Sequence, residues 1–577
     1  MTSDYCYRFV CFVPLDANSP RFFGFSELLA GLALMVLAWT LADIRYRFRV
    51  RSTPLPLQGL TFAVVGAVGV LTLLTDLWRA EQWLVPRGNL ISPAGWQALL
   101  GALFLLTFLT WTWFAFIRPP KYGKRNARRY AQTLYHFILK GSPSELPVVA
   151  DELAYSAKSL IHHATSHAPF EKFRKRQTEG AEPKDDRSEV TAIADDILLL
   201  IGDKRFCRAI VESSPRTALA VFNAIGETEK YYVQVGVFAK NILNEGVTNR
   251  DSFMFHEAEG YDSGLIGYHK PLSQAMFSNH KMVEAIGRIL DPDYPASSKW
   301  DAAQWAAYSR VVLMTFRDYV QKGATNHSFV LSRAKGHIEH IVMDLYKLDG
   351  VPTLAWDDDI FARLRVAVDF VKDGINILEE KGPPEYLKLR IREEHVFLTP
   401  YDQLASMIGD IIFAASAVRS PAHLCWQVQH NSVWHNLFNF HHLEGPAADN
   451  VKFKVRRIIY DEISDMKRFP NFKGAKILSF CLNVMGYAIE DTDYDLDSRA
   501  LHKAVLSWTK KNYAWLHSYN PRIAEACLVD GATYDAANFR LVKTYPVEGL
   551  RREPHFVYLD VDPPSVEKEK TDDDSLS

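Results

Sequence analysis

Residues 24–43 read GFSELLAGLALMVLAWTLAD, an apolar run with only two carboxylates. Two similar runs follow, LQGLTFAVVGAVGVLTLLTDLW at 57–78 and WQALLGALFLLTFLTWTWFAFI at 96–117. Each is close to the ~20 residues that a helix needs to cross a ~30 Å hydrocarbon core. Arginines follow the first run in place of a small-residue cleavage site, which indicates a retained helix and not a signal peptide. The sequence therefore predicts an N-terminal segment, 1–23, and a region of three transmembrane helices within 24–117.

Basic residues are concentrated on one side of these helices. That side carries Arg45, Arg47, Arg49 and Arg51 in the first loop, and Arg118, Lys121, Lys124, Arg125, Arg128 and Arg129 after the third run. The other side has only Arg8, Arg21, Arg79 and Arg87. Because basic loops stay in the cytoplasm, we expect the N-terminus outside and the region after residue 118 inside, in a plasma or bacterial inner membrane. The basic residues of the inner side would then lie against the headgroups of the lipid bilayer.

Two kinds of residue within the runs need an explanation. Glu27 and Asp76 are ionisable groups near the ends of their runs, where we expect hydration to satisfy them. Gly59, Gly66 and Gly69 form a stripe of small residues that permits close approach of another helix. Packing within the three-helix bundle and self-association explain that stripe equally well.

Length and composition limit the possibilities further. At 577 residues the chain exceeds what one core usually organises, so at least two units are expected. The formal net charge of -2 gives no signal for nucleic acid. The six cysteines include no CxxC pair, which argues against a zinc ribbon. Cys6 and Cys11 would lie outside the membrane, where they either pair or remain free.

The region after residue 118 shows repeated signals for helix starts. A capping side chain precedes proline at Ser142, Ser214, Thr399, Ser420 and Asn520. We therefore expect a mainly α protein whose cytoplasmic part has helical subdomains at 118–350 and 351–560 and little β structure. The one clear strand pattern, HFVYLDV at 555–561, has no obvious partner and is interpreted as a terminal arm. The polar tail, 561–577, is expected to be disordered.

One segment has spacing suited to a metal. His337, His340 and Asp344 occur at i, i+3 and i+7 in HIEHIVMD, which places two imidazoles and a carboxylate on one face of a helix. A catalytic metal would need further ligands that the sequence does not indicate. The polar face of an ordinary amphipathic helix is the favoured alternative.

A second segment, 420–445, is rich in histidine and aromatic residues. At 100° per residue a single helix would place His423, His430, Trp434 and His441 on one face. Such a face could bind metal, respond to pH or stack rings. The spacing matches neither HExxH nor a zinc finger, so imidazoles packed among aromatic rings are the favoured interpretation.

The third candidate is the glycine-rich segment HEAEGYDSGLIGYHK at 256–270. Its backbone amides could face an anion, with side chains close by as further ligands. The residues concerned are His256, Gly260, Gly264, Gly267, His269 and Lys270. The segment matches neither the P-loop nor the dinucleotide-binding pattern, so a structural turn is the alternative.

These observations leave three hypotheses of different classes. The first, which demands least, is a membrane-tethered sensor, scaffold or signalling module that has protein partners or self-associates. The second is a membrane-attached hydrolase or nucleotide-processing enzyme that uses the 256–270 segment and nearby histidines. The third is an oligomeric channel or membrane-disrupting effector. No cofactor is indicated by the sequence.

Overall fold

The protein is mostly helical, with 71% of residues in helices and 4% in strands, which confirms the mainly α class. It is described by a computed structural model that covers residues 5–7, 10–15, 21–41, 43–86, 92–165, 188–259, 271–323, 327–353, 355, 357–384, 387, 399–438, 443–489, 498–545 and 553–564. Contacts divide the chain into two compact units, Met1–Glu245 and Gly246–Ser577.

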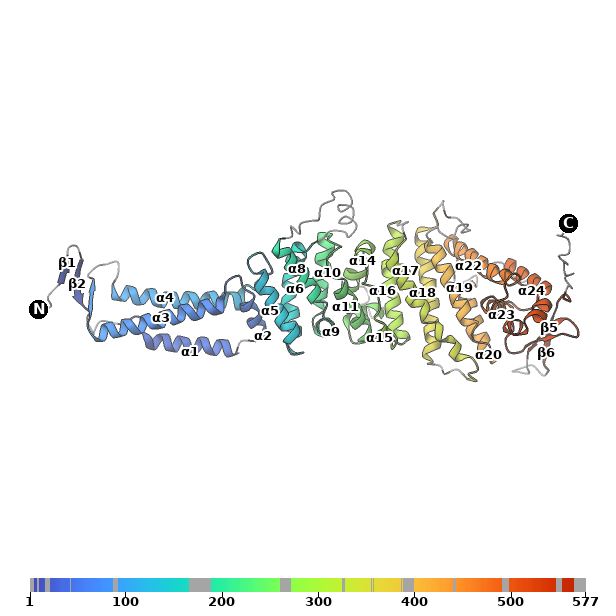
Figure 1. The fold of residues 1–577 in the computed structure, drawn as a ribbon, viewed down its shortest axis with the longest axis horizontal. Helices are drawn as coiled ribbons and strands as arrows, with labels where there is room; N and C mark the ends of the chain where they lie inside the picture. Colours follow the sequence, from blue (N-terminus) through green and yellow to red (C-terminus); the bar gives the residue numbers. More distant parts are fainter. Residues whose placement is uncertain are drawn as a thin grey trace, which may run out of the picture. The chain divides into compact units, whose positions relative to one another are not determined.

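Three apolar helices lie side by side in the first unit (Figure 1). They are α1 (Phe25–Leu41), α3 (Leu57–Ala80) and α4 (Pro93–Thr112), and α4 continues into the π-helical turn η1 (Trp113–Ile117). Two helical segments, Leu57–Ala80 and Pro93–Ile117, are long and apolar enough to cross a membrane. At 1.5 Å per residue the 17 residues of α1 extend only about 25 Å. The structure therefore supports two of the three predicted spans, and the third is a shorter apolar helix.

The interior of this helix bundle is small, and much of its apolar surface faces outward. Leu28, Val68 and Leu100 form its buried centre. Large apolar side chains remain exposed on all three helices, among them Leu34, Phe62, Val70, Leu99 and Leu106. A continuous apolar exterior of this kind is unusual for a protein surrounded by water.

Glycines at the helix contacts differ from the predicted stripe. A Cβ at Gly69 would meet Leu28 at 3.3 Å, whereas one at Gly59 or Gly66 would meet no atom within 4 Å in the described part of the chain. The closest approach occurs at Gly31 of α1, where a Cβ would lie 2.8 Å from the ring of Phe104. Close packing in the bundle thus depends on an isolated glycine that the periodic pattern did not indicate.

Glu27 and Asp76 both accept hydrogen bonds at the N-terminus of α1. Asp76 Oδ2, on α3, accepts a hydrogen bond from Phe25 N (3.0 Å), and Glu27 Oε2 accepts one from Gly24 N (2.9 Å). The first N–H groups of a helix have no partner within the helix, and anionic acceptors satisfy them well. A protein amide therefore satisfies one oxygen of each carboxylate, where the sequence had suggested hydration.

A small sheet lies at the end of the bundle that includes the start of α1 (Figure 1). Its order is β1–β2–β3, and its strands are β1 (Tyr5–Tyr7), β2 (Val10–Pro14) and β3 (Leu84–Pro86). The pairing of β2 with β3 joins the N-terminal segment to the loop between α3 and α4. In the β1–β2 ladder Cys6 is directly opposite Cys11. The sequence prediction contained none of these strands.

Helices make up the rest of the first unit. They are α2 (Ile44–Arg51), α5 (Ala127–Lys140), α6 (Leu146–His163), α8 (Glu189–Leu200), α9 (Lys204–Ser213), α10 (Pro215–Thr228) and α11 (Gly236–Thr248), within which the unit boundary falls. Asp43 ends the first predicted span early because it is the N-cap residue of α2, where its carboxylate accepts from Ile44 N (2.7 Å).

The second unit is also built mainly from helices. They are α12 (Phe253–Glu259), α13 (Pro271–Phe277), α14 (His280–Ile286), α15 (Tyr294–Ser297), α16 (Ala302–Gln321), α17 (Phe329–His340), η2 (Met343–Leu348), α18 (Asp359–Lys381), α19 (Pro400–Ala415), α20 (Ala422–Cys425), η3 (Trp426–Trp434), α21 (His435–Phe438), α22 (Pro446–Asp465), α23 (Phe472–Met485), α24 (Arg499–Tyr519) and α25 (Pro521–Ala526).

The strand predicted at 555–561 is confirmed, but its interpretation as a terminal arm is wrong. The strands β4 (Ala532–Asp535), β5 (Arg540–Tyr545) and β6 (His555–Asp560) form an antiparallel sheet of order β4–β5–β6. Every residue of β6 has a partner in β5. The periodicity of residues 555–561 identifies a strand but not its pairing partner. The partner strands β4 and β5 are short and mostly polar, so their own sequences do not stand out as strands. Of the predicted disordered tail, residues 565–577 lie outside the described residues.

Candidate functional site: the charge cluster on helix α2

Helix α2 has the sequence IRYRFRVR, with arginine at every second position. Residues four apart lie on the same face of a helix, whereas residues two apart point in nearly opposite directions. Arg45 and Arg49 therefore share one face, and Arg47 and Arg51 share another. The sequence analysis assigned all four arginines to the membrane surface, but they lie in two different environments.

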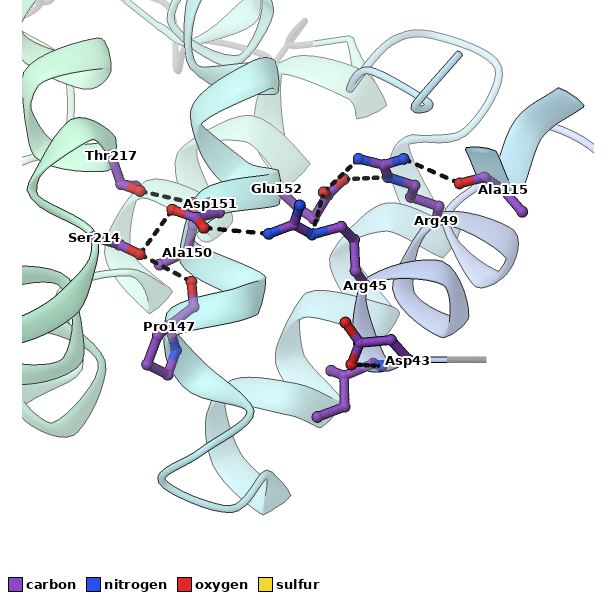
Figure 2. Close-up of polar contacts among 11 residues, drawn as sticks. Asp43, Arg45, Arg49, Ala115, Pro147, Ala150, Asp151, Glu152, Ser214 and Thr217 are labelled. Atoms are coloured by element: carbon purple, nitrogen blue, oxygen red, sulfur yellow. Dashed lines mark hydrogen bonds and ion pairs between the residues drawn. The ribbon is translucent and has the colours of Figure 1, made fainter. Parts of the chain in front are cut away.

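Arg49 forms a buried bidentate ion pair with Glu152 of α6 (Figure 2). Arg49 Nε donates to Glu152 Oε2 at 2.8 Å, and Arg49 Nη2 donates to Glu152 Oε1 at 2.7 Å. The remaining nitrogen, Nη1, donates to the carbonyl oxygen of Ala115 in η1 at 3.0 Å. The side chains of Arg49 and Glu152 are 9% and 2% exposed. One guanidinium thus joins α2, α6 and the end of the third apolar run.

Arg45 extends the cluster at its more exposed edge. Its guanidinium lies 3.4 Å from Asp151 Oδ2 and 3.5 Å from Glu152 Oε1. Asp151 Oδ1 also accepts a hydrogen bond from Ser214 Oγ at 2.8 Å (Figure 2). Ser214 precedes α10, so the polar contacts continue from α2 through α6 to the start of a third helix.

The contacts of Ser214 with α6 explain why this residue does not cap α10 with its side chain, as the sequence predicted. Ser214 is the N-cap residue of α10, yet its side chain caps no amide. Its hydroxyl contacts Asp151 and the carbonyl oxygen of Pro147 on α6. Thr217 Oγ1, on the first turn of α10, donates to the carbonyl oxygen of Ala150 at 2.7 Å. Polar side chains at the start of α10 are therefore used to attach that helix to α6.

An apolar contact holds α2 beside the charge cluster. Phe48 is 1% exposed and packs edge-on against Tyr130 of α5, with ring centroids 5.6 Å apart. Two hydrogen bonds also hold the turn after α2 in place. Asn126 Nδ2 donates to the carbonyl oxygen of Ser52 (2.8 Å), and Arg129 Nη1 donates to the carbonyl oxygen of Pro54 (2.8 Å). Burial of the phenyl ring and these bonds fix α2 on α5 and α6.

The electrostatics keep Arg49 charged. Its hydrogen bonds to Glu152 raise the pKa of Arg49 further, although burial acts in the opposite direction. A buried ion pair gains little net stability because both ions lose hydration, but removal of one partner leaves an unpaired buried charge. Separation of α2 from α6 at this point would therefore leave a buried charge without its partner.

Of the other basic residues predicted at the membrane surface, some form ion pairs and others are exposed. Arg47 lies 3.6 Å from Glu145, and Arg128 is ion-paired with Glu189. The remaining members of the predicted set, apart from Arg129, are exposed: Arg51, Lys121, Lys124 and Arg125. Arg49, expected at the membrane surface, is instead buried against Glu152. The sequence could not show this because the partner carboxylate is 103 residues away.

The predicted metal ligands lie at the end of α17. His337 and His340 are on this helix, and Asp344 follows in η2. The Asp344 carboxylate is occupied by cations, with Lys347 Nζ at 2.7 Å and Arg363 Nη1 at 4.0 Å. Within the described residues no three His, Cys, Asp or Glu side chains are grouped so that they could hold a metal ion.

The histidine-rich segment folds differently from the single α-helix assumed. His423 is on α20, and His430 lies within the nine-residue π-helix η3. A π-helix pairs residues five apart, so the faces calculated at 100° per residue do not apply. His430 stacks on Trp426 with centroids 3.9 Å apart and lies 6.2 Å from His435. His441 lies outside the described residues.

Only one residue of the glycine-rich candidate can be located. His256 is on α12, where its ring lies 6.2 Å from that of Phe255. Gly260, Gly264, Gly267, His269 and Lys270 lie outside the described residues. The anion-binding prediction for this segment stays a prediction.

Sequence reasoning missed the acidic half of the cluster, Asp151 and Glu152. A signal was present, because Glu152 lies on the apolar face of α6 together with Val149 and Leu153, and all three are buried. A carboxylate on the buried face of a helix requires a partner, either a cation or hydrogen-bond donors. Which arginine supplies it could not be read from the sequence.

Comparison of the chain with protein-family models, curated proteins and solved structures finds no match.

Proposed function

We propose that the chain is an integral membrane protein that acts as a membrane-tethered sensor or scaffold, with its N-terminus outside and its helical region in the cytoplasm. In this topology α1, α3 and α4 each cross the bilayer. The short α1 can be accommodated by local thinning of the bilayer. The outward-facing apolar side chains of all three helices then contact lipid.

The connections at the two ends of the bundle support an odd number of crossings. At one end β2 pairs with β3, so the N-terminal segment and the loop between α3 and α4 share one side. At the other end α2 packs against α5 and α6, which follow the third apolar helix. The basic residues of this second end favour the cytoplasmic side.

The observation that carries the functional proposal is the set of three hydrogen bonds made by Arg49. They connect the loop between two apolar helices, the end of the third, and α6. A rearrangement of the membrane helices must therefore either move α6 or break a buried ion pair. Coupling of this kind is what a sensor or a regulated scaffold requires.

Affinity purification of the full-length protein from native membranes tests the proposal, with mass photometry of the recovered complexes. We expect specific protein partners or a homo-oligomer, and altered recovery for Glu152→Gln, which removes the charge that Arg49 contacts. Glu227→Gln is the matched control, because Glu227 forms an exposed ion pair with Lys158 of the same α6. A monomer without partners, or equal recovery from both variants, would contradict the proposal.

A further inference from the structure

The face of α2 opposite the charge cluster borders a pocket of about 120 Å³. It lies where α2 meets the end of α1, the start of α3 and the end of α4. The lining side chains that matter here are Trp39, Tyr46, Arg47, Arg51, Gln58 and Trp111. Arg45 and Arg49 do not line it, so the pocket and the charge cluster use different halves of the same arginine pattern.

The pocket has more hydrogen-bond donors than acceptors. Arg51 makes no hydrogen bond or ion pair within the described part of the chain. Arg47 is half exposed, and its nearest approach to the Glu145 carboxylate is 3.6 Å. Trp39 Nε1 is buried and has no hydrogen-bond partner among the described residues. No carboxylate is among the described residues that line the pocket, so its two guanidinium groups attract an anion.

Aromatic rings form the apolar side of the pocket. Trp39 and Trp111 have centroids 6.5 Å apart, and Trp111 is 4% exposed. Phe116, beside the pocket, lies 4.3 Å from Tyr46 and 5.9 Å from Trp111. Trp and Tyr next to basic side chains are typical of the boundary between hydrocarbon and headgroups. The pocket therefore combines anion-binding groups with a wall suited to the apolar part of a lipid.

We propose that this pocket binds the phosphate group of an anionic phospholipid of the cytoplasmic leaflet. The proposal rests on the membrane orientation given under the proposed function. A volume of about 120 Å³ admits a phosphate group and a few waters but not a whole lipid, so the acyl chains would lie along the exposed apolar side chains of α1 and α4. Arg47 and Arg51 would contact the phosphate oxygens. A soluble phosphate ester offers the same oxygens, and the test below separates the two sources.

The test is native mass spectrometry of the full-length protein released from nanodiscs of phosphatidylcholine, with or without phosphatidylglycerol. We expect wild type to retain phosphatidylglycerol in preference to phosphatidylcholine. Arg47→Gln/Arg51→Gln should weaken that preference roughly 30-fold, because both guanidinium groups that contact the phosphate are lost, at about 1 kcal/mol for each lost hydrogen bond. Lys124→Gln/Arg125→Gln is the matched control, since it removes two exposed charges that do not line the pocket.

Two further arms make the outcome decisive. Arg47→Lys/Arg51→Lys keeps the charges, so it should retain more phosphatidylglycerol than the glutamine variant; equal loss in both would overturn the proposal. Equal lipid retention by the glutamine variant and wild type, or equal loss in the Lys124/Arg125 control, would also overturn it. Displacement of the lipid by millimolar inorganic phosphate would overturn the lipid assignment in favour of a soluble anion. Recovery of partners, which depends on Glu152, is a separate readout and reports on the proposed function independently.

Discussion

Arg49 and Glu152, 103 residues apart in the chain, form a bidentate ion pair from which water is largely excluded. Replacement of one member by an uncharged side chain leaves the other charge buried and unpaired. We expect Arg49→Met or Glu152→Met alone to cost about 3–5 kcal/mol in the local stability of the contact between α2 and α6. The double variant Arg49→Met/Glu152→Met should cost clearly less than the sum, because no unpaired charge remains.

Hydrogen exchange of the α2 and α6 amides in the full-length protein measures this effect. Costs that simply add in the double variant would show that the two residues act independently.

The carboxylate of Asp76 should stabilise the first turn of α1, since it accepts the hydrogen bond from Phe25 N. Asp76→Ala should cost about 1 kcal/mol at that turn, the usual effect of removing a capping acceptor. Asp76→Asn keeps an acceptor oxygen and should cost less. Hydrogen exchange at residues 25–28 provides the measurement, and Glu81→Ala, an exposed acid beyond the end of α3, is the control. Equal effects of Asp76→Ala and Glu81→Ala would exclude the capping role.

Cys6 and Cys11 should form a disulfide if the N-terminal segment is in an oxidising compartment. Residues directly opposite in an antiparallel pair have Cα atoms roughly 4.5–5.5 Å apart, within the range that a disulfide spans. Alkylation of the denatured protein should label four of its six cysteines before reduction and all six afterwards. In Cys6→Ser the count before reduction should rise to five, because Cys11 loses its partner. Six labelled thiols in unreduced wild type would contradict the pairing.

The pKa of Lys543, on β5, should lie below that of an ordinary lysine. It is 8% exposed, and burial lowers its pKa from 10.5 to about 8, although its Nζ donates to the carbonyl oxygen of Asn483 at 3.1 Å. Between pH 10.5 and 8 the unfolded chain binds more protons at this amine than the folded protein does. Lowering the pH through this window therefore favours unfolding.

Competitive acetylation of the full-length protein, read out by peptide mass spectrometry against the exposed Lys510, measures this titration. The rate for Lys543 should show a midpoint near pH 8. A midpoint near 10.5 would show that burial does not disfavour the charged amine.

Features set by neighbours in the chain were largely predictable from the sequence. Ser92 Oγ accepts from Gly95 N (3.0 Å), Thr399 and Asp402 form the expected capping box, and Asn520 caps α25. Such bonds join residues three apart, so the local pattern already contains both partners. The long apolar helices α3 and α4 were predictable for a similar reason, since length and hydropathy are properties of one segment.

The candidate site depended on contacts that no local pattern contains. The arginine repeat of α2 indicated a basic loop, but only packing against α6 separates Arg45 and Arg49, which contact Asp151 and Glu152, from Arg47 and Arg51, which line a pocket. The same holds for Ser214, whose hydroxyl contacts Asp151 and caps no amide.

The amino-acid sequence by itself determined the helical class, the apolar spans and the side on which the arginines gather, because each follows from composition and short-range periodicity. Only the tertiary structure decided which arginine is neutralised, which strand pairs with β6 and which distant carboxylate accepts from the first turn of α1. Those outcomes depend on which distant groups satisfy buried charges and backbone hydrogen bonds. Desolvation requires that each buried polar group has a partner, but it does not determine which residue that partner is.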